Sequence, residues 1–478
     1  MRKLPLPRKL QSFAHTLLLS CLSFAAGCGA GNLQPTSSQP PQPAAATSTQ
    51  LRIGDAPADK VFSFEITLGS SISMAPANGG AASVITISAN RLELSHTAAK
   101  LEPLVLTNLK PGNYSSADIT IQSPSITYTK LLFMPEPVTL IDRFTGNDQS
   151  VHVTFDPPLV IGSAPLVLNL DVDTADALIM DGGGNIVGTN FKPNSITFST
   201  QPVGPATNQQ DDDGEIEDET GKIVEVSSSG FVLATGQSGA RLPFTVDATS
   251  ELPPGLALPN LLNRLVKVEG FTSSNGVLFA KEVEILGDQN ASQLEGIVWQ
   301  VGSFNNPSLV AMSAQDGTGA GITVTQVGQD FLMDISTLPN ASFSVDFGNC
   351  GMAPAGDPSL VFDSTHLKAG QRLEVITETG VSETQSILPQ QVRLQQQAVS
   401  GTVTNIATMP GGLASFDLAL PADSFLTLLS GASRVHVLQQ PRTDNRFGAL
   451  SEGAPVRVRG ALLWTGTQFT MVARRITQ

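Results

Sequence analysis

The pattern that most constrains this chain is a short alternation of apolar and polar residues, repeated along its length and punctuated by Gly, Pro and Asn. It is clear in "KVFSFEITLGSSISM", where Val61 to Leu68 predict a half-buried strand, and again in "PLVLNLDVDTADALIM". A period of two residues is that of a β-strand. We find no stretch of fifteen residues with a convincing helical period, and only 14% of the chain is charged. The sequence therefore predicts an all-β protein.

The first part of the chain, residues 51–200, predicts one β-sandwich domain. Its alternating stretches are separated by turn signals such as Pro111–Asn113 and "DGGGN" at Asp181–Asn185. A series of about seven short strands with such turns is typical of two packed sheets.

The second part predicts three small β-barrel-like repeats, at residues 220–287, 294–395 and 399–478. Each opens with a glycine before a β-branched strand, as in "TGKIVEV", "LEGIVWQV" and "VSGTVTNI", and each ends on a second glycine motif and a final strand. The middle repeat is enlarged by an insertion near Asn340–Asp357. Closure removes exposed sheet edges, so such short strands favour small barrels. The glycines are expected where strands bend or backbones approach closely.

The N-terminus predicts a lipoprotein signal peptide over residues 1–27. A basic start precedes the apolar run Phe13–Phe24, which is too short for a permanent membrane span, and "AAGC" ends at Cys28. Cys28 would then carry the lipid, and the Pro/Ser/Gln/Ala-rich residues 28–50 would form a flexible tether. The alternative is an ordinary secretory signal with Cys28 incidental. Gly29 rather than Asp after the cysteine favours an outer-membrane location in the cell envelope.

The most charged passage, "NQQDDDGEIEDETGKIVEV", raises the question of a metal site. Asp211 and Asp213 would be ligands three and five of a calcium loop, but Gln209 and Thr220 stand where its first and last carboxylates are needed. We therefore expect residues 201–219 to be a solvated acidic linker. The histidines that remain after processing lack ligand spacing, so we expect neither a metal nor a cofactor; they are His96, His152, His366 and His436.

Charge and motifs also bear on partners and catalysis. Without residues 1–27 the chain carries 23 basic and 42 acidic residues, a net charge of −19, which argues against nucleic acid as a partner. The expected partners are a membrane, through the lipid anchor, and an envelope protein or glycan. The sequence holds no G-x-S-x-G, H-E-x-x-H, Walker or S-x-x-K motif, and we expect no enzymatic activity.

Three residues near the C-terminus are candidate ligand-binding residues. Trp464 precedes the turn of the last hairpin and is either exposed for binding or packed. Arg457 and Arg459 alternate with valines, so their side chains share one strand face. That face is either simply solvated or an electropositive patch that docks on an acidic polymer, lipid phosphates or the protein's own acidic segment.

Two groups of motifs carry a resemblance to uncharacterised bacterial envelope families. Asp55-Ala56-Pro57, Leu109–Tyr114 and Leu168–Asp173 resemble the signatures of a lipoprotein family related to transthyretin-like or carbohydrate-binding-like sandwiches. The second half resembles tandem copies of another uncharacterised module with "G-x-V" openings and "G-x-x-V-x-V-x-G" closings. Gly453 to Gly460 fit that closing, whereas Asn263 replaces its first glycine in the first repeat. Neither resemblance implies a catalytic residue set.

Together these patterns favour a non-catalytic, lipid-anchored envelope protein that acts as a binding, adhesion or scaffold module. Two alternatives stay open. A row of exposed aromatic residues would favour carbohydrate binding in support of polysaccharide handling, and two carboxylates facing each other across a cleft would favour a hydrolase with an unrecognised site.

Overall fold

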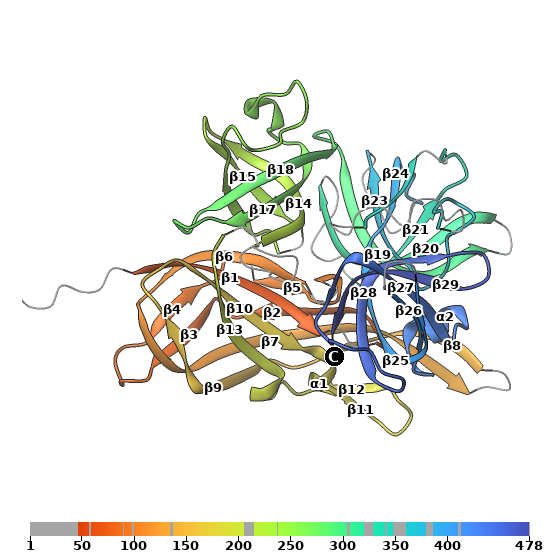
Figure 1. The fold of residues 1–478 in the computed structure, drawn as a ribbon, viewed down its shortest axis with the longest axis horizontal. Helices are drawn as coiled ribbons and strands as arrows, with labels where there is room; N and C mark the ends of the chain where they lie inside the picture. The colour runs from red at the N-terminus through yellow and green to blue at the C-terminus, as the bar shows by residue number, and fades with distance from the viewer. Residues whose placement is uncertain are drawn as a thin grey trace, which may run out of the picture. The chain divides into compact units, whose positions relative to one another are not determined.

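The computed structural model describes residues 46–477 except 57–58, 89, 98–99, 134–136, 205–214, 237, 304–305, 320–327, 340–341, 348–359, 379–385 and 410–412. The all-β prediction is confirmed. Strands dominate the described residues, and the helical elements there are short: α1 (Thr174–Ala177), α2 (Phe425–Ser430) and the 3-10 turns η1 (Ser95–Thr97), η2 (Pro193–Ser195) and η3 (Leu258–Leu261) (Figure 1). No helix among these residues is long and apolar enough to cross a bilayer. Cys28 and the predicted signal and tether up to residue 45 lie outside the described residues.

The first module is a sandwich of two sheets. One sheet has the order β13-β10-β1-β6, and the other has the order β4-β3-β7-β2-β5, with β8 and β9 also paired to β7. The strands are β1 (Thr47–Ala56), β2 (Val61–Leu68), β3 (Ser71–Pro76), β4 (Ser83–Thr86), β5 (Arg91–Glu93), β6 (Leu101–Leu109), β7 (Gly112–Phe133), β8 (Pro137–Thr145), β9 (Gln149–Ile161), β10 (Leu166–Asp173) and β13 (Ile196–Pro202). A separate hairpin pairs β11 (Leu178–Met180) with β12 (Ile186–Thr189).

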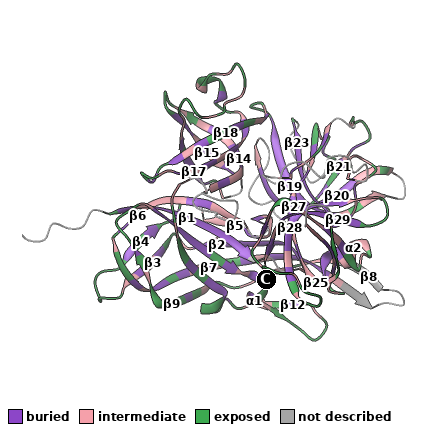
Figure 2. Cartoon of the chain, in the orientation of Figure 1, coloured by how far each residue is buried: buried purple, intermediate pink, exposed green. Residues whose placement is uncertain are grey.

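The sandwich core forms because alternate residues of both sheets are apolar. Leu51 and Leu168 from one sheet share a single buried cluster with Phe64 and Ile119 from the other. The same alternation leaves one face of β9 in solvent, so buried and exposed residues alternate along the first part of this strand (Figure 2). The predicted strand at Val61 to Leu68 is β2, which is buried on both faces rather than half-buried.

Two further modules are closed five-stranded barrels with the same strand order. The first barrel runs β14-β15-β16-β18-β17 and the last barrel runs β25-β26-β27-β29-β28. In each, the third strand pairs in parallel with the fifth, which closes the barrel. Their strands are β14 (Glu215–Val226), β15 (Gly230–Thr235), β16 (Arg241–Thr245), β17 (Leu265–Thr272), β18 (Leu278–Gly287), β25 (Gln396–Thr408), β26 (Ala414–Ala419), β27 (Arg434–Asn445), β28 (Pro455–Trp464) and β29 (Phe469–Thr477).

The module between them has the same order of pairing but stays open, as the sheet β21-β20-β19-β23-β24-β22. Its third strand, β21, pairs with the residues that precede its fifth strand, β24, at a single bridge, Met333–Ile387. The free edge of β24 pairs instead with β22, which comes from the predicted insertion. The strands are β19 (Ser292–Ser303), β20 (Asn306–Gly319), β21 (Asp330–Asp334), β22 (Phe343–Val345), β23 (Arg372–Thr377) and β24 (Gln391–Leu394).

The opening glycine of each repeat occupies one structural position. Gly221, Gly296 and Gly401 lie opposite Val266, Leu373 and Val456 in the neighbouring strand. A Cβ at each would stand 2.2–2.5 Å from a carbonyl oxygen of the second strand. This close approach of backbones explains why the repeat needs glycine there.

The fourth strand distinguishes the closed barrels from the open module. Gly270 and Gly460 each sit at a β-bulge against the fifth strand, and a Cβ at either would lie 2.1 Å from a backbone oxygen of that strand. Counting from the register, Thr377 takes this place in β23, whose ladder to β24 has no bulge and ends one residue earlier, at Ile376. A bulge bends a strand and increases its twist, so the glycine bulge helps the fifth strand to reach the third.

The prediction that residues 201–219 form a solvated linker is wrong at both ends, since residues 201–202 are the end of β13 and residues 215–219 belong to β14. Residues 215–219 are the start of β14, and this strand is mostly buried or half-buried (Figure 2). Residues 205–214, which include Asp211 and Asp213 of the rejected calcium loop, lie outside the described residues. The acidic run predicted a solvated linker because the local sequence does not show that Glu217 and Asp218 contact buried basic side chains.

Candidate functional site

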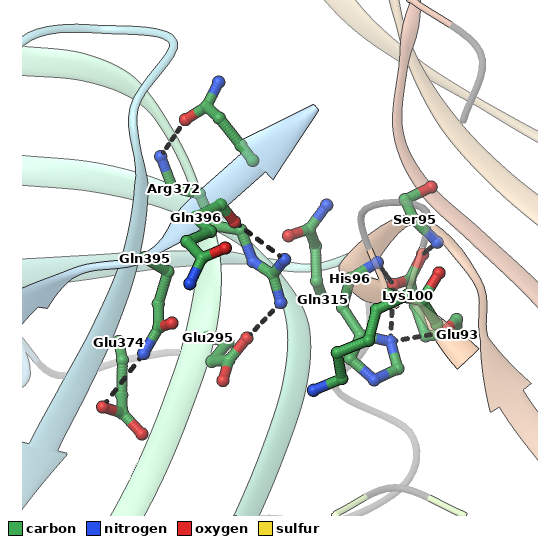
Figure 3. Close-up of polar contacts among 12 residues, drawn as sticks. Glu93, Ser95, His96, Lys100, Glu295, Gln315, Arg372, Glu374, Gln395 and Gln396 are labelled. Atoms are coloured by element: carbon green, nitrogen blue, oxygen red, sulfur yellow. Dashed lines mark hydrogen bonds and ion pairs between the residues drawn. The ribbon is translucent and has the colours of Figure 1, made fainter. Parts of the chain in front are cut away.

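A buried group of charged side chains lies where strands from all four modules meet. We call it the junction cluster. Figure 3 shows part of it, with side chains from the sandwich and from the middle module directed toward one another. Its members are His96, Lys100, Glu102, Glu217, Asp218, Glu219, Lys267, Glu295, Asp316, Asp346, Arg372, Glu374, Arg459 and Arg474.

The sandwich contributes His96 from η1 and Glu102 from β6. The Nε2 atom of His96 lies 2.8 Å from a carboxylate oxygen of Glu102, and Nδ1 contacts the carbonyl oxygen of Glu93 (Figure 3). Burial alone would lower the pKa of His96, but the carboxylates of Glu102 and Glu93 outweigh it and hold this pKa well above its usual range. His96 is therefore a cation that partners Glu102.

Glu217 in β14 is an acid of the cluster with two arginine partners. Its carboxylate accepts from Arg474 at 2.9 Å and lies 3.5 Å from Arg459, both in the last barrel. Lys100 of the sandwich donates to its backbone carbonyl at 2.8 Å. Burial would raise the pKa of Glu217, yet these cations lower it to about 2.

Lys267 and Arg372 link the first barrel and the middle module to the same cluster. The Lys267 Nζ atom lies 2.6 Å from Asp218 and 3.4 Å from Asp346. Arg372 donates to Glu295 at 2.5 Å. Each cation thus has a carboxylate at hydrogen-bonding distance, which a buried charge requires.

Three carboxyls in the cluster have raised pKa values. Burial, followed by the charge of Asp346, raises the pKa of Asp218. Burial, followed by the charge of Glu102, raises the pKa of Glu219 to about 8. Burial, followed by the charge of Glu295, raises the pKa of Glu374 to about 7. Pairs of carboxyls with separated pKa values are typical of acid–base sites, but buried ion networks produce the same shifts.

The size of the enclosed space decides between these interpretations. The cavity among the cluster residues measures about 50 Å³. Ligand pockets generally measure several hundred Å³, whereas a water needs about 10–15 Å³ of such space. The cavity has room for a few waters but not for a ligand of ordinary size, so the arrangement is better suited to joining modules than to binding a substrate. No group of three or more His, Cys, Asp or Glu in the described part of the chain is placed to hold a metal ion.

Two of the three candidate binding residues come together in the structure. Arg457 and Arg459 of β28 line one cavity between the last barrel and the sandwich. Arg457 is half-buried and Arg459 is 6% exposed, so neither belongs to a freely solvated face. Of the acidic partners considered from the sequence, the chain's own acidic segment is the one that Arg459 contacts, at Glu217.

Trp464 lies away from that pair, at the end of β28. Its ring packs edge-on against Phe469 with centroids 5.1 Å apart, and Lys368 of the middle module lies 4.8 Å from its centroid. Trp464 is half-buried, as a packing residue.

The sequence did not single out the remaining members of the junction cluster. His96 stood out only as a histidine without ligand spacing. Lys267 and Arg372 carried a usable signal, because each is a cation inside a strand of a chain that is sparing with charge. A charged residue in a short apolar strand needs a buried partner or a wet face.

Comparison with solved structures gives low similarity. A wild-type single-stranded DNA binding protein from Thermus aquaticus shares 14% identity over 39% of this chain and 91% of its own, with a TM-score of 0.15. A multidomain protein with nucleic acid binding domains from Streptococcus pneumoniae shares 12% identity over 54% of this chain and 72% of its own, with a TM-score of 0.11. No curated protein matches the chain.

These matches contradict the exclusion of nucleic acid from the expected partners, which were a membrane and an envelope protein or glycan. Both similar structures are of proteins described as binding nucleic acid. The exclusion rested on net charge, which is a sum over the whole chain and says nothing of a local surface. TM-scores this low establish no other partner in their place.

One segment of the chain has a family match. Residues 220–284, which run through the first barrel from β14 to β18, match the model of a domain of unknown function, DUF5666. The first of the three predicted repeats thus contains a DUF5666 domain.

Proposed function

We propose that this chain is a non-catalytic scaffold protein of the cell envelope, in which four β modules are held together as one body. The observation that carries the proposal is the junction cluster, in which hydrogen bonds and ion pairs join side chains from every module. Lys100 of the sandwich donates to the backbone carbonyl of Glu217 in the first barrel, and Arg474 of the last barrel pairs with the Glu217 carboxylate. Lys267 of the first barrel pairs with Asp346 of the middle module.

Contacts outside the cluster support the same role. Lys60 of the sandwich lies 2.6 Å from Asp423 of the last barrel, and Arg393 of the middle module lies 3.2 Å from Glu284 of the first barrel. Modules joined by flexible linkers alone need no buried charges between them. Buried ion pairs favour one arrangement over others, since a mispaired buried charge is costly.

The location is part of the proposal. We propose that Cys28 carries the lipid, that residues 28–50 form the tether, and that the scaffold belongs to the outer membrane. The short apolar run, the "AAGC" sequence and the resemblance of residues 50–200 to a lipoprotein family support this assignment.

Neither alternative has a specific observation in its favour. The exposed large apolar side chains of the described residues are all aliphatic, so they form no aromatic platform. The closely spaced carboxylates of the junction cluster surround a space of about 50 Å³.

Differential scanning calorimetry of the purified chain tests the scaffold role. Four modules that share one charged junction are expected to unfold in a single transition whose calorimetric and van't Hoff enthalpies agree. Separate transitions for the sandwich and the barrels would overturn the proposal.

For the location, radiolabelled fatty acid should be incorporated by the parent chain and not by Cys28→Ala, and incorporation by that variant would refute lipidation at Cys28.

A further inference from the structure

A second cavity lies between the sandwich and the last barrel, beside the junction cluster. It measures about 280 Å³, near the lower end of the range for small-molecule pockets. Strands β10 and β13 form one wall with Asn169 and Gln201, and β28 forms another with Arg457 and Arg459. We call it the arginine pocket.

The lining of the arginine pocket is rich in positive charge. Five basic residues line it, against two acids, Asp55 and Asp171; the basic residues are Lys100, Arg446, Arg457, Arg459 and Arg475. Asp55 already accepts hydrogen bonds from the backbone and hydroxyl of Thr174, at 3.1 and 3.0 Å. Burial raises the pKa of Asp55 well above its usual range, which further reduces the negative charge in the pocket.

The same walls hold buried polar atoms without a hydrogen-bond partner in the described part of the chain. Two are donors, the Nε–H groups of Arg457 and Arg459, and two are acceptors, the side-chain oxygens of Asn169 and Gln201. Asn169 is 2% exposed and Arg459 is 6% exposed. A buried polar atom left unsatisfied costs free energy. These four atoms are themselves inaccessible from the cavity, so an occupant reaches them only when their side chains, which line the cavity, turn toward it.

We propose that the arginine pocket binds a small organic oxyanion that also carries hydroxyl groups. The guanidinium groups donate to the phosphoryl or carboxylate oxygens, for which their planar geometry is suited. The amide oxygens of Asn169 and Gln201 accept from the ligand hydroxyls. The proposal goes beyond the scaffold role and does not rest on it, because the pocket can be filled or empty in a rigid body.

Isothermal titration calorimetry on the purified chain tests the pocket with four probes. Glycerol 3-phosphate and glycerate present an oxyanion with hydroxyls, inorganic phosphate presents the oxyanion alone, and glycerol presents hydroxyls alone. We expect binding of at least one hydroxylated anion, at least about tenfold tighter than inorganic phosphate and much tighter than glycerol. The comparison of the two hydroxylated anions shows whether the site prefers phosphoryl or carboxylate. No binding of either at millimolar concentration would overturn the proposal.

Variants locate the binding in this pocket. Arg457→Gln should weaken binding of the hydroxylated anion about tenfold or more, while Arg434→Gln, an exposed arginine of the same barrel, should leave it unchanged. Gln201→Leu should weaken the hydroxylated anion and spare inorganic phosphate, and it gives a second test if Arg457→Gln does not fold. Equal effects of the two arginine variants, or binding unaffected by both pocket variants, would place the ligand elsewhere and refute the assignment.

Discussion

The closed barrels and the open middle module share strand order, opening glycine and apolar pattern, yet only the barrels close. Their fourth strands differ where Gly270 and Gly460 form bulges, because the ladder of β23 with β24 ends at Ile376, one residue before the equivalent Thr377. The partner of the fifth strand also differs, since β22 occupies the edge of β24. Strand order is thus encoded within each repeat, whereas closure depends on one bulge and on what competes for one edge.

The modules also differ in how their first strands are paired in the junction cluster, and this difference should have the largest energetic effect. Glu217→Gln in the first barrel leaves Arg459 and Arg474 without their carboxylate and should lower the free energy of unfolding by about 3–5 kcal/mol. Glu295→Gln in the middle module removes the partner of Arg372 alone and should cost less. Chemical denaturation measures both.

A control on the same strand separates burial from charge. Glu225→Gln in β14 breaks an exposed pair with Arg241 and should cost less than about 1 kcal/mol. Equal losses for Glu217→Gln and Glu225→Gln would show that the junction cluster does not hold the modules together.

The bulge glycine can be exchanged between the two kinds of module. Gly460→Thr gives the last barrel the residue of the open module and forces a side chain against the carbonyl of Val472, so we expect a loss of about 3 kcal/mol. Amide hydrogen exchange should report opening between β27 and β29. Gly182→Ala, at a glycine with open space around it, should cost little.

The reverse exchange distinguishes the bulge from the occupied edge. Thr377→Gly should destabilise the middle module by about 1 kcal/mol without closing it, because β22 still pairs with β24. Strong new protection of amides along β21 would show that the bulge alone decides closure.

Protonation of the junction cluster should make stability depend on pH. The pKa of Glu219 is about 8 in the folded chain, above its ordinary value of 4.5, so the folded state holds a proton that the unfolded state has released. Stability from this group is full below about pH 4.5 and falls as the pH rises toward 8, by up to about 1.4 kcal/mol per pH unit. Glu217 acts in the opposite sense, and its contribution is lost as the pH falls from about 4.5 toward 2.

Substitution tests this assignment. Glu219→Gln cannot release a proton, so it should reduce the slope of the decline between pH 5 and pH 8, leaving the part that comes from Glu374, and leave the decline at low pH unchanged. If the free energy of unfolding has the same slope in parent and variant across pH 5–8, Glu219 does not cause the pH dependence.

The smallest expected effect concerns the contact between the middle module and the last barrel. Lys368→Met keeps the stem of the side chain but removes the charge above the ring of Trp464, and it should cost about 0.5–1 kcal/mol. Indole fluorescence should shift with little change in the unfolding midpoint. A loss above about 2 kcal/mol would mean that Lys368 has a structural role beyond this ring contact.

Local patterns predicted much of the fold and little of the candidate site. The alternation of apolar residues predicted β2, and the glycine motif correctly indicated a close backbone approach at Gly221. Asn263 departs from the motif yet keeps its conformation, since its φ of 65° is left-handed like the 81° of Gly453, and asparagine tolerates that region.

The site was missed because its determinants are distant in the sequence. Nothing near Glu217 indicates that Arg474 will lie 2.9 Å away, and a run of acids without that partner is reasonably interpreted as a solvated linker. The glycine motif that ends the middle repeat has its last glycine at Gly380, outside the described residues, whereas the register aligns Thr377 with Gly270 and Gly460. Because the glycine of the motif lies three residues after Thr377, the motif does not reveal that Thr377 replaces the bulge glycine of the closed barrels.

The span of the junction cluster along the chain has a consequence for biosynthesis. His96 and Lys100 leave the ribosome hundreds of residues before Arg459 and Arg474. The earlier modules are therefore synthesised before the arginines that pair with Glu217 are available. A nascent chain that stops before Arg459 keeps Glu217 without either arginine. Such a chain has unpaired charges at a loosely packed junction, and proteases and chaperones that act on loosely packed intermediates can remove it.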